Sequence, residues 1–224
     1  MEAAAGDTIH SAVVPIGVEA REVPVIPFNV NAHRLLSVAT MHYPPNAEAI
    51  RWFARDMWPI LRSEHPDLEV DIVGSRPPRD IIDLGKLDQG MCVHGFVEDV
   101  EHLYRQAAVF IVPLQTGSGV RVKILEAMAR GIPVVSTTVG ADGLDVRHGV
   151  HLLIADTPHD FARSVTLLLE QPELRSRVAR AARQRTLALY DWRQCCRPLL
   201  EAYQDLATIS RTDARGGGSP FSLH

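Results

Sequence analysis

The 224-residue chain is 46% hydrophobic and 22% charged, a composition typical of a globular protein with a sizeable core. Its 23 basic residues face 27 acidic ones, for a formal net charge of −4, so no overall basic field favours nucleic acid as a partner. The chain shows no signal-peptide pattern and no apolar run near the roughly 20 residues of a membrane span, and we expect it in the cytoplasm.

Residues 1–33 contain short apolar pieces separated by prolines, and we interpret them as a connector. From 34 to 190, short apolar runs alternate with longer helical patterns, which predicts one folded domain. Strands are expected at 35–40, 68–74, 91–96, 109–114, 133–138 and 151–155. Most are apolar at nearly every position, as in strands covered by helices on both faces.

Helical spacing predicts helices between these strands and after them. They are expected at 46–64, 98–107, 120–130, 161–169, 173–189 and 191–207. Asn46 is the expected N-cap of the first helix, and Pro59 is expected to kink it. Strands alternating with helices predict an α/β fold, a Rossmann-like, doubly wound parallel sheet. Residues 191–208 are then a C-terminal helix, and the Gly/Ser-rich 209–224 a disordered tail.

A glycine-rich loop lies just before the helix expected from Val120. Gly117, Ser118 and Gly119 can direct backbone amides to one point, where the helix N-terminus adds its own, and such amides bind phosphate. Arg121 and Lys123 follow in the first turn, where positive charge costs about 0.3 to 1 kcal/mol against the helix macrodipole. An anionic ligand would offset that cost; the alternative is that both are solvated surface residues.

Glu126 has two interpretations that periodicity does not separate. It lies four residues before Arg130, a spacing that favours an exposed ion pair contributing about 0.2 to 0.5 kcal/mol. It also lies about one turn beyond the glycine-rich loop, where its carboxylate could accept two hydrogen bonds from vicinal sugar hydroxyls.

The stretch GSGVRVKILEAMARGIPVVSTTVGADGL (117–144) resembles the donor-binding half of GT-B glycosyltransferases of the retaining family 4 type. The stretches at 44–74, 93–114 and 167–192 resemble the same C-terminal domain in order and spacing, and VVPIGVE (13–19) is similar to the hinge that precedes it. The resemblance covers about residues 13–207 and implies a single GT-B C-terminal half-domain.

The resemblance implies a role for each matching residue. Glu126 would hold the ribose of a nucleotide sugar, and Lys123 or Arg121 would compensate the diphosphate. The diphosphate would meet the amides of Gly117, Ser118, Gly119 and Val120; the nucleobase would meet Gly95 and Phe96; and Gly74, Ser75 and Arg76 would form a neighbouring wall. From the residues alone, Gly95 is a turn glycine and Phe96 an aromatic at the edge of the core.

Two positions depart from the family pattern. Ser118 stands where many members place the first glutamate of a pair, so no carboxylate can reach the transferred sugar from there. After the first strand, where many members carry a basic residue, the chain offers Thr40, Met41 and His42. His42 could donate a hydrogen bond, but a lone loop histidine is more often incidental.

The resemblance implies a hexosyltransferase that moves sugar from a nucleotide-diphosphate sugar, such as a UDP-sugar, to a polysaccharide or lipid-linked acceptor. Neither cofactor nor metal is expected, because Arg121 and Lys123 would stabilise the leaving group; the catalytic residues on the acceptor side stay unknown. A GT-B enzyme also needs an acceptor domain, so we expect a missing N-terminal domain or a partner subunit, and a location peripheral to the inner membrane face. The alternative is a non-catalytic or truncated nucleotide-sugar-binding module.

Overall fold

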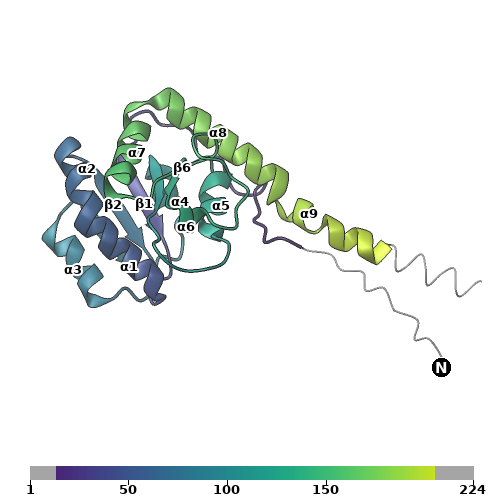
Figure 1. Ribbon diagram of the computed structural model, residues 1–224, viewed down its shortest axis with the longest axis horizontal. Helices are drawn as coiled ribbons and strands as arrows, with labels where there is room; N and C mark the ends of the chain where they lie inside the picture. The colour runs from purple at the N-terminus through teal and green to yellow at the C-terminus, as the bar shows by residue number, and fades with distance from the viewer. Residues whose placement is uncertain (1–13, 205–224) are drawn as a thin grey trace, which may run out of the picture.

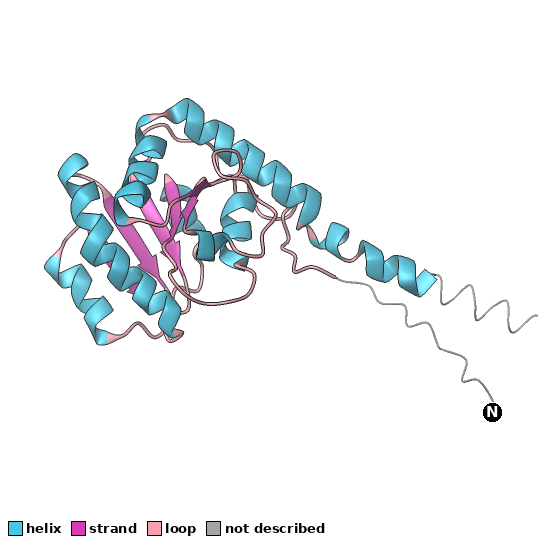
Figure 2. Ribbon diagram, in the orientation of Figure 1, coloured by secondary structure: helices cyan, strands magenta, loops and turns pink. Residues whose placement is uncertain are grey.

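The computed structural model describes residues 14–204 and contains one six-stranded sheet with the order β3-β2-β1-β4-β5-β6. The strands are β1 (Arg34–Val38), β2 (Glu69–Val73), β3 (Met91–Gly95), β4 (Val109–Val112), β5 (Val134–Ser136) and β6 (Leu153–Ile154). Every neighbouring pair is parallel, and helices cover both faces (Figures 1 and 2). The predicted doubly wound α/β fold is confirmed, and each of the six predicted strands is present.

Strand β4 shows why the strand sequences are apolar at nearly every position. Val109 and Ile111 point into the core formed with α1, α2 and α7, whereas Phe110 and Val112 point into the core formed with α4 and α5. All four side chains are buried. Both faces of the sheet are therefore dry, and alternation with polar residues would leave unpaired polar groups inside.

The predicted helix 46–64 is interrupted. It consists of α1 (Pro44–Trp52), a π-helical segment (Phe53–Met57) and α2 (Trp58–Glu64). Asn46 as N-cap is wrong, because the helix starts at Pro44, after Tyr43. Pro59 lacks the N–H that an α-helix needs, and the irregularity appears just before it, where the Trp58 N–H donates to the carbonyl of Phe53.

The remaining helices are α3 (Arg79–Leu87), α4 (Glu101–Gln106), α5 (Val122–Ala129), α6 (Thr138–Ala141), α7 (Pro158–Glu170), α8 (Pro172–Leu189) and α9 (Trp192–Cys195). Helices α3 and α6 were not predicted. Helix α3 buries only Ile81, and α6 has four residues, so neither gives a strong periodic signal. The predicted helix 191–207 breaks at Cys196 and resumes to residue 204. No helix within residues 14–204 is long and apolar enough to cross a membrane.

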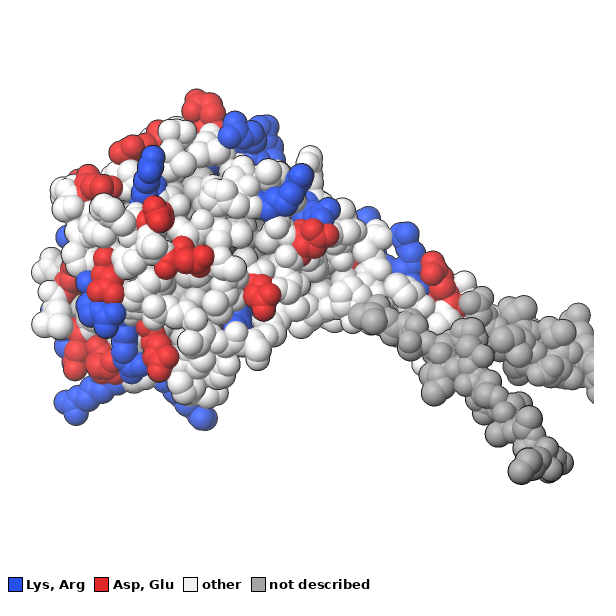
Figure 3. Space-filling model, in the orientation of Figure 1, with Lys and Arg blue, Asp and Glu red and all other residues white. Residues whose placement is uncertain are grey.

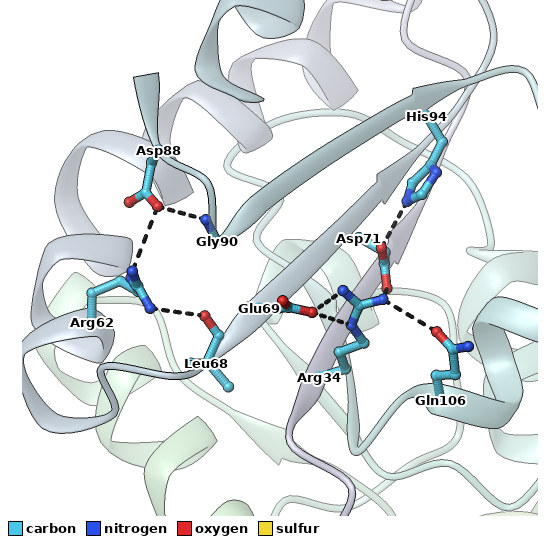
Figure 4. Close-up of polar contacts among 9 residues, drawn as sticks. All are labelled: Arg34, Arg62, Leu68, Glu69, Asp71, Asp88, Gly90, His94 and Gln106. Carbon is cyan, nitrogen blue, oxygen red and sulfur yellow. Dashed lines mark hydrogen bonds and ion pairs between the residues drawn. The ribbon is translucent and has the colours of Figure 1, made fainter. Parts of the chain in front are cut away.

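A buried carboxylate connects the first three strands. Asp71 in β2 is 1% exposed; its Oδ1 lies 2.7 Å from Nε2 of His94 in β3, and its Oδ2 lies 3.4 Å from Nη1 of Arg34 in β1 (Figure 4). Arg34 also pairs with Glu69 and donates to Gln106 at the end of α4. These bonds satisfy a charge that would be costly to bury alone and help to fix the register of the strands.

The connector packs against the domain over its described part, residues 14–33. The Val18 N–H donates to the carbonyl of Tyr190 (2.7 Å), and the Ile26 N–H donates to the carbonyl of Arg130 (2.9 Å). Val18 and Ala20 are buried beside α5. Residues 1–13 and the predicted tail 209–224 lie outside the described residues.

Arg175 of α8 holds the end of this connector. Its guanidinium is buried and donates to the carbonyls of Asn29 (2.7 Å), Val30 (3.0 Å) and Ala32 (3.2 Å). It also lies 4.8 Å from the ring centre of Phe28. Burial lowers the pKa of Arg175, and the carbonyl oxygens supply the partners that water would otherwise provide.

Replacing Arg175 should therefore destabilise the fold. We expect Arg175→Ala to lower the free energy of unfolding by about 3 kcal/mol, because the buried side chain and its three charged hydrogen bonds to backbone carbonyls are lost. Arg177→Ala, at an exposed position of the same helix, should change it by less than about 0.5 kcal/mol. Urea unfolding followed by circular dichroism measures both; equal effects would contradict the assigned role.

Candidate functional site

A cleft of about 450 Å³ lies at the carboxyl ends of β1, β2 and β3, beside the N-terminus of α5. Its lining residues are Val38, Ala39, Thr40, Tyr43, Asn46, Val73, Gly74, Ser75, Phe96, Val97, Val100, Val120, Arg121, Val122 and Lys123. The strand order reverses between β1 and β4, and ligands of doubly wound sheets bind at this reversal, outside the carboxyl ends of the strands.

The cleft brings together six of the predicted site residues: Gly74, Ser75, Phe96, Val120, Arg121 and Lys123. Gly117, Ser118 and Gly119 lie in the loop before Val120, and Gly95 directly precedes Phe96. Glu126 is placed elsewhere: it lines a neighbouring cavity of about 350 Å³. Val122 lines both hollows, so the two adjoin across this side chain.

The loop after β1 contributes other residues to the cleft than the sequence suggested. His42 is exposed and does not line the cleft, whereas Tyr43 and Asn46 do. No role was predicted for Tyr43, and Asn46 was predicted only as a helix cap. Asn46 lies in the first turn of the helix that follows β1, close to the carboxyl ends of the strands, where ligands of such sheets bind. That placement was the signal available for it.

Gly74 is required where β1 and β2 end. A Cβ atom at this position would lie 1.6 Å from the carbonyl oxygen of Ala39. Only a separation of the two backbones could relieve this clash. The Gly74 N–H also donates to the carbonyl of Gly95 (2.8 Å). This wall of the cleft therefore consists of closely packed backbone. Such a wall can present amide and carbonyl groups directly to a ligand.

The glycine-rich loop has the backbone that its composition predicts. Gly117 has φ +116° and Gly119 φ +89°, conformations that other residues rarely adopt. Helix α5 begins at Val122, two residues later than predicted, so Arg121 is the N-cap residue and Lys123 lies in the first turn. Nη1 of Arg121 donates to the carbonyl of Ser118 (2.8 Å), and its Nε is buried without a partner.

Lys123 is held in the cleft by a neutral group. Its Nζ donates to Oδ1 of Asn46 (3.2 Å), while Nδ2 of Asn46 donates to the carbonyl of Thr40 (2.9 Å). Burial, together with the positive charge of Arg121, lowers the pKa of Lys123 to about 8. Within residues 14–204 neither cation forms an ion pair with a carboxylate, and neither side chain belongs to an exposed residue.

Two positive groups beside a helix N-terminus, with no internal counter-charge in the described chain, favour an anion at this point. The site is local. On the face that Figure 3 shows, basic and acidic residues are interspersed, with no broad patch of one sign.

Glu126 does not form the ion pair with Arg130 that its spacing allowed. Arg130 instead places Nε 3.1 Å from Oε2 of Glu101 and lies 4.4 Å from the ring centre of Tyr104. Burial raises the pKa of Glu126, and the charge of Arg130 partly opposes this. The carboxylate of Glu126 therefore has free acceptor capacity beside the cleft.

No three His, Cys, Asp or Glu side chains among residues 14–204 are grouped to hold a metal ion.

Comparison with known proteins identifies the family. The sequence profile described as "Glycosyl transferases group 1" matches residues 32–171, more than half of the chain. A curated relative, the uncharacterized 44.6 kDa protein in the cps region of Klebsiella pneumoniae, is 28% identical over 145 residues. The match covers 62% of this chain but 37% of that protein; the chain spans well under half the length of the curated relatives it matches.

Solved structures show the same fold. HepE of Anabaena, in a complex with UDP and glucose, matches with a TM-score of 0.69 and 16% identity, over 86% of this chain and 56% of HepE. The C-terminal domain of LpcC, a glycosyl transferase group 1 family protein of Francisella tularensis, matches with a TM-score of 0.63 and 17% identity. That match covers 78% of this chain and 98% of the LpcC domain, and at these identities it concerns the fold alone.

The ionisation of Lys123 can be measured directly, because the chain has only two lysines, Lys86 and Lys123. Reductive methylation with ¹³C-formaldehyde should give two lysine signals in NMR, and Lys86→Arg assigns them. We expect Lys123 to titrate near pH 8 and inorganic pyrophosphate to raise this pKa by about one unit, because an anion favours the charged form.

The affinity for pyrophosphate should depend on pH in the corresponding sense. The protonated amine binds the anion, so affinity should fall by up to about tenfold as pH rises above 8. Lys123→Met should show only the change that comes from the ionisation of pyrophosphate itself. A pyrophosphate affinity that varies identically in both proteins would contradict a role for Lys123.

Proposed function

Because the chain belongs to the glycosyl transferases of group 1, we propose that it supplies the donor-binding half of a retaining, GT-B hexosyltransferase. It transfers a sugar from a nucleotide-diphosphate sugar to a polysaccharide or glycolipid acceptor. The observation that carries this proposal is the pair of cations, Arg121 and Lys123, without a carboxylate partner among the described residues. Their charge suits a diphosphate.

In this proposal the diphosphate lies on the glycine-rich loop. The amides of Gly117, Ser118, Gly119 and Val120 donate hydrogen bonds to its oxygens, and the first turn of α5 adds its own N–H groups. Lys123 and Arg121 supply positive charge at the same point. Ammonium and guanidinium groups both bind phosphate strongly when ionised.

The nucleoside then extends from this loop past Val122. Glu126, which lies one turn further along α5, accepts hydrogen bonds from the two ribose hydroxyls. The base reaches the backbone of Gly95 and the ring of Phe96, which is 75% exposed at the rim. Gly74 and Ser75 close the opposite wall. This path is supported by the two cavities, which adjoin at Val122.

The proposed catalysis is electrostatic. When the bond between the anomeric carbon and the diphosphate oxygen breaks, negative charge grows on the departing nucleoside diphosphate. Lys123, Arg121 and the loop amides are already oriented toward that charge, and preorganised donors of this kind lower the barrier. The proposal assigns the leaving group to these residues without a metal or cofactor.

UDP is the first nucleotide to test. HepE, which shares the fold, is described in a complex with UDP and glucose. We therefore propose UDP as the nucleotide of the donor for this chain. We also propose that the protein acts in the cytoplasm at the inner membrane face, where lipid-linked acceptors are available.

The proposed partner is an acceptor-binding domain or subunit. Figure 1 shows α9 and the helical stretch after it extending away from the sheet. Trp192, Leu199, Leu200 and Tyr203 are between 41% and 64% exposed on this extension. Exposed apolar side chains on a projecting helix favour burial against another domain.

A second candidate is a nucleotide-sugar-binding module without catalytic activity. Ser118 favours it, because a serine hydroxyl in the loop cannot supply a carboxylate to the transferred sugar. Sugar transfer by the chain, alone or with an acceptor-binding partner, would exclude this candidate.

Calorimetric titration with UDP, GDP and ADP tests the donor site. We expect one diphosphate to bind, and Glu126→Ala to weaken it by at least about 1 kcal/mol, or fivefold, through the loss of a charged hydrogen bond. Glu173→Ala, at an exposed position on α8, is the control and should bind as the wild type does. Failure of all three nucleotides to bind a chain with native circular dichroism would refute the proposal for the chain alone.

A further inference from the structure

Glu126 is free because its neighbour on the helix is engaged elsewhere. Residues four apart on a helix lie on one face, and Glu126 followed by Arg130 is the favourable order for an ion pair. That pair would occupy the carboxylate oxygens that a ribose needs. In the structure Arg130 turns to α4. Its Nη1 and its backbone N–H both donate to the backbone carbonyl of Glu126 (3.2 Å each), and neither reaches the carboxylate.

Three contacts hold the guanidinium of Arg130 in this place. Its Nε lies 3.1 Å from Oε2 of Glu101, Nη1 donates to the carbonyl of Glu126, and Cζ lies 4.4 Å from the ring centre of Tyr104. Only Glu101 among them offers a negative charge. The side chains of Arg130 and Glu101 are 13% and 21% exposed, so their attraction is less screened than that of a surface pair.

Glu101 is itself fixed in position. It is the first residue of α4, and its N–H donates to Oδ1 of Asp99 (2.9 Å). Its Oε1 is buried without a hydrogen bond, with Nε of Arg105 3.9 Å away. A carboxylate at a helix N-terminus also interacts favourably with the helix dipole, which suits the counter-charge of Arg130.

We propose that Glu101 is a positioning residue for the donor site: by binding Arg130 it keeps the carboxylate of Glu126 available to the ribose hydroxyls. This rests on the proposed function. The charged and titratable groups around Glu126 are Tyr104, Glu101 and Arg105 from α4, Arg130 from α5, and Glu19 from the connector. Lys123 lies three residues before Glu126 on α5 but is held by Asn46, so Arg130 is the cation whose charge acts on Glu126.

The first test is nucleotide binding by a set of variants. Glu101→Gln removes the charge that attracts Arg130, so Arg130 pairs with Glu126 and affinity for UDP falls about fivefold, the size of coupling expected between neighbouring groups. Adding Arg130→Gln removes the competitor, so the double variant should bind within about twofold of Arg130→Gln alone. Loss of a purely structural contact would instead make the double variant the weakest binder.

Glu98→Gln is the matched control. Glu98 is exposed in the loop that precedes α4. Its substitution changes the net charge by the same amount as Glu101→Gln but leaves the contacts of Arg130 intact. Its affinity for UDP should equal that of the wild type. Circular dichroism of every variant confirms that the comparison is between folded proteins.

A second readout does not need a nucleotide. The pKa of Glu126 can be followed by NMR with ¹³C-labelled glutamate, with the signal assigned by Glu126→Gln. Glu101→Gln should lower this pKa, because Arg130 then pairs with the carboxylate; the double variant should return it to at least the wild-type value.

The two readouts separate the two proposals. If the wild type binds none of UDP, GDP and ADP, the proposed function fails, and the pKa comparison still decides whether Glu101 holds Arg130 away from Glu126. If the pKa of Glu126 does not fall in Glu101→Gln, or UDP affinity is unchanged there, the positioning role is overturned.

Discussion

The burial of α5 is the constraint on which the candidate site depends. Ile124, Ala127 and Met128 pack into the core on the sheet, and Leu125 and Ala129 pack beneath the connector and Tyr190. Its last carbonyls are also bound: Arg183 of α8 donates to that of Ala129, and the Ile26 N–H donates to that of Arg130. A helix held along two sides and at its end cannot rotate, so its N-terminus and the strip formed by Val122, Lys123 and Glu126 keep a fixed direction.

The charged side chains near the start of α5 have neutral hydrogen-bond partners, and Arg130 is held away from the carboxylate of Glu126. Asn46 holds Lys123 through an amide oxygen, and a carbonyl holds Arg121. Each arrangement keeps the side chain oriented while leaving its charge uncompensated, which costs folding free energy and favours a ligand of opposite charge. The lowered pKa of Lys123 is the direct sign of that cost. Charge that the fold leaves unbalanced is thereby available for binding.

The strands and the glycine-rich loop could be predicted because their signals are local. Strands buried on both faces are apolar at successive positions, and Gly117 and Gly119 occupy backbone conformations that favour glycine. The start of α5, the unpredicted α3 and the π-helical segment depend on packing that periodicity does not encode. The contact of Asn46 with Lys123 spans 77 residues and that of Glu101 with Arg130 spans 29; only the fold brings these partners together, so the sequence left both interpretations of Glu126 open.

The connector and α9 together form part of the cavity beside Glu126. Val18 and Glu19 of the connector and Trp192 of α9 line the same cavity as Glu126. The Val18 N–H and carbonyl bond to Tyr190 and Trp192, so connector and helix form one unit. A domain bound to the exposed side of Trp192 would therefore act on a wall of the cavity that holds Glu126. In the proposed function, binding of the donor and docking of a partner would share this boundary, and by linkage a shift of that wall by either one would alter the affinity for the other.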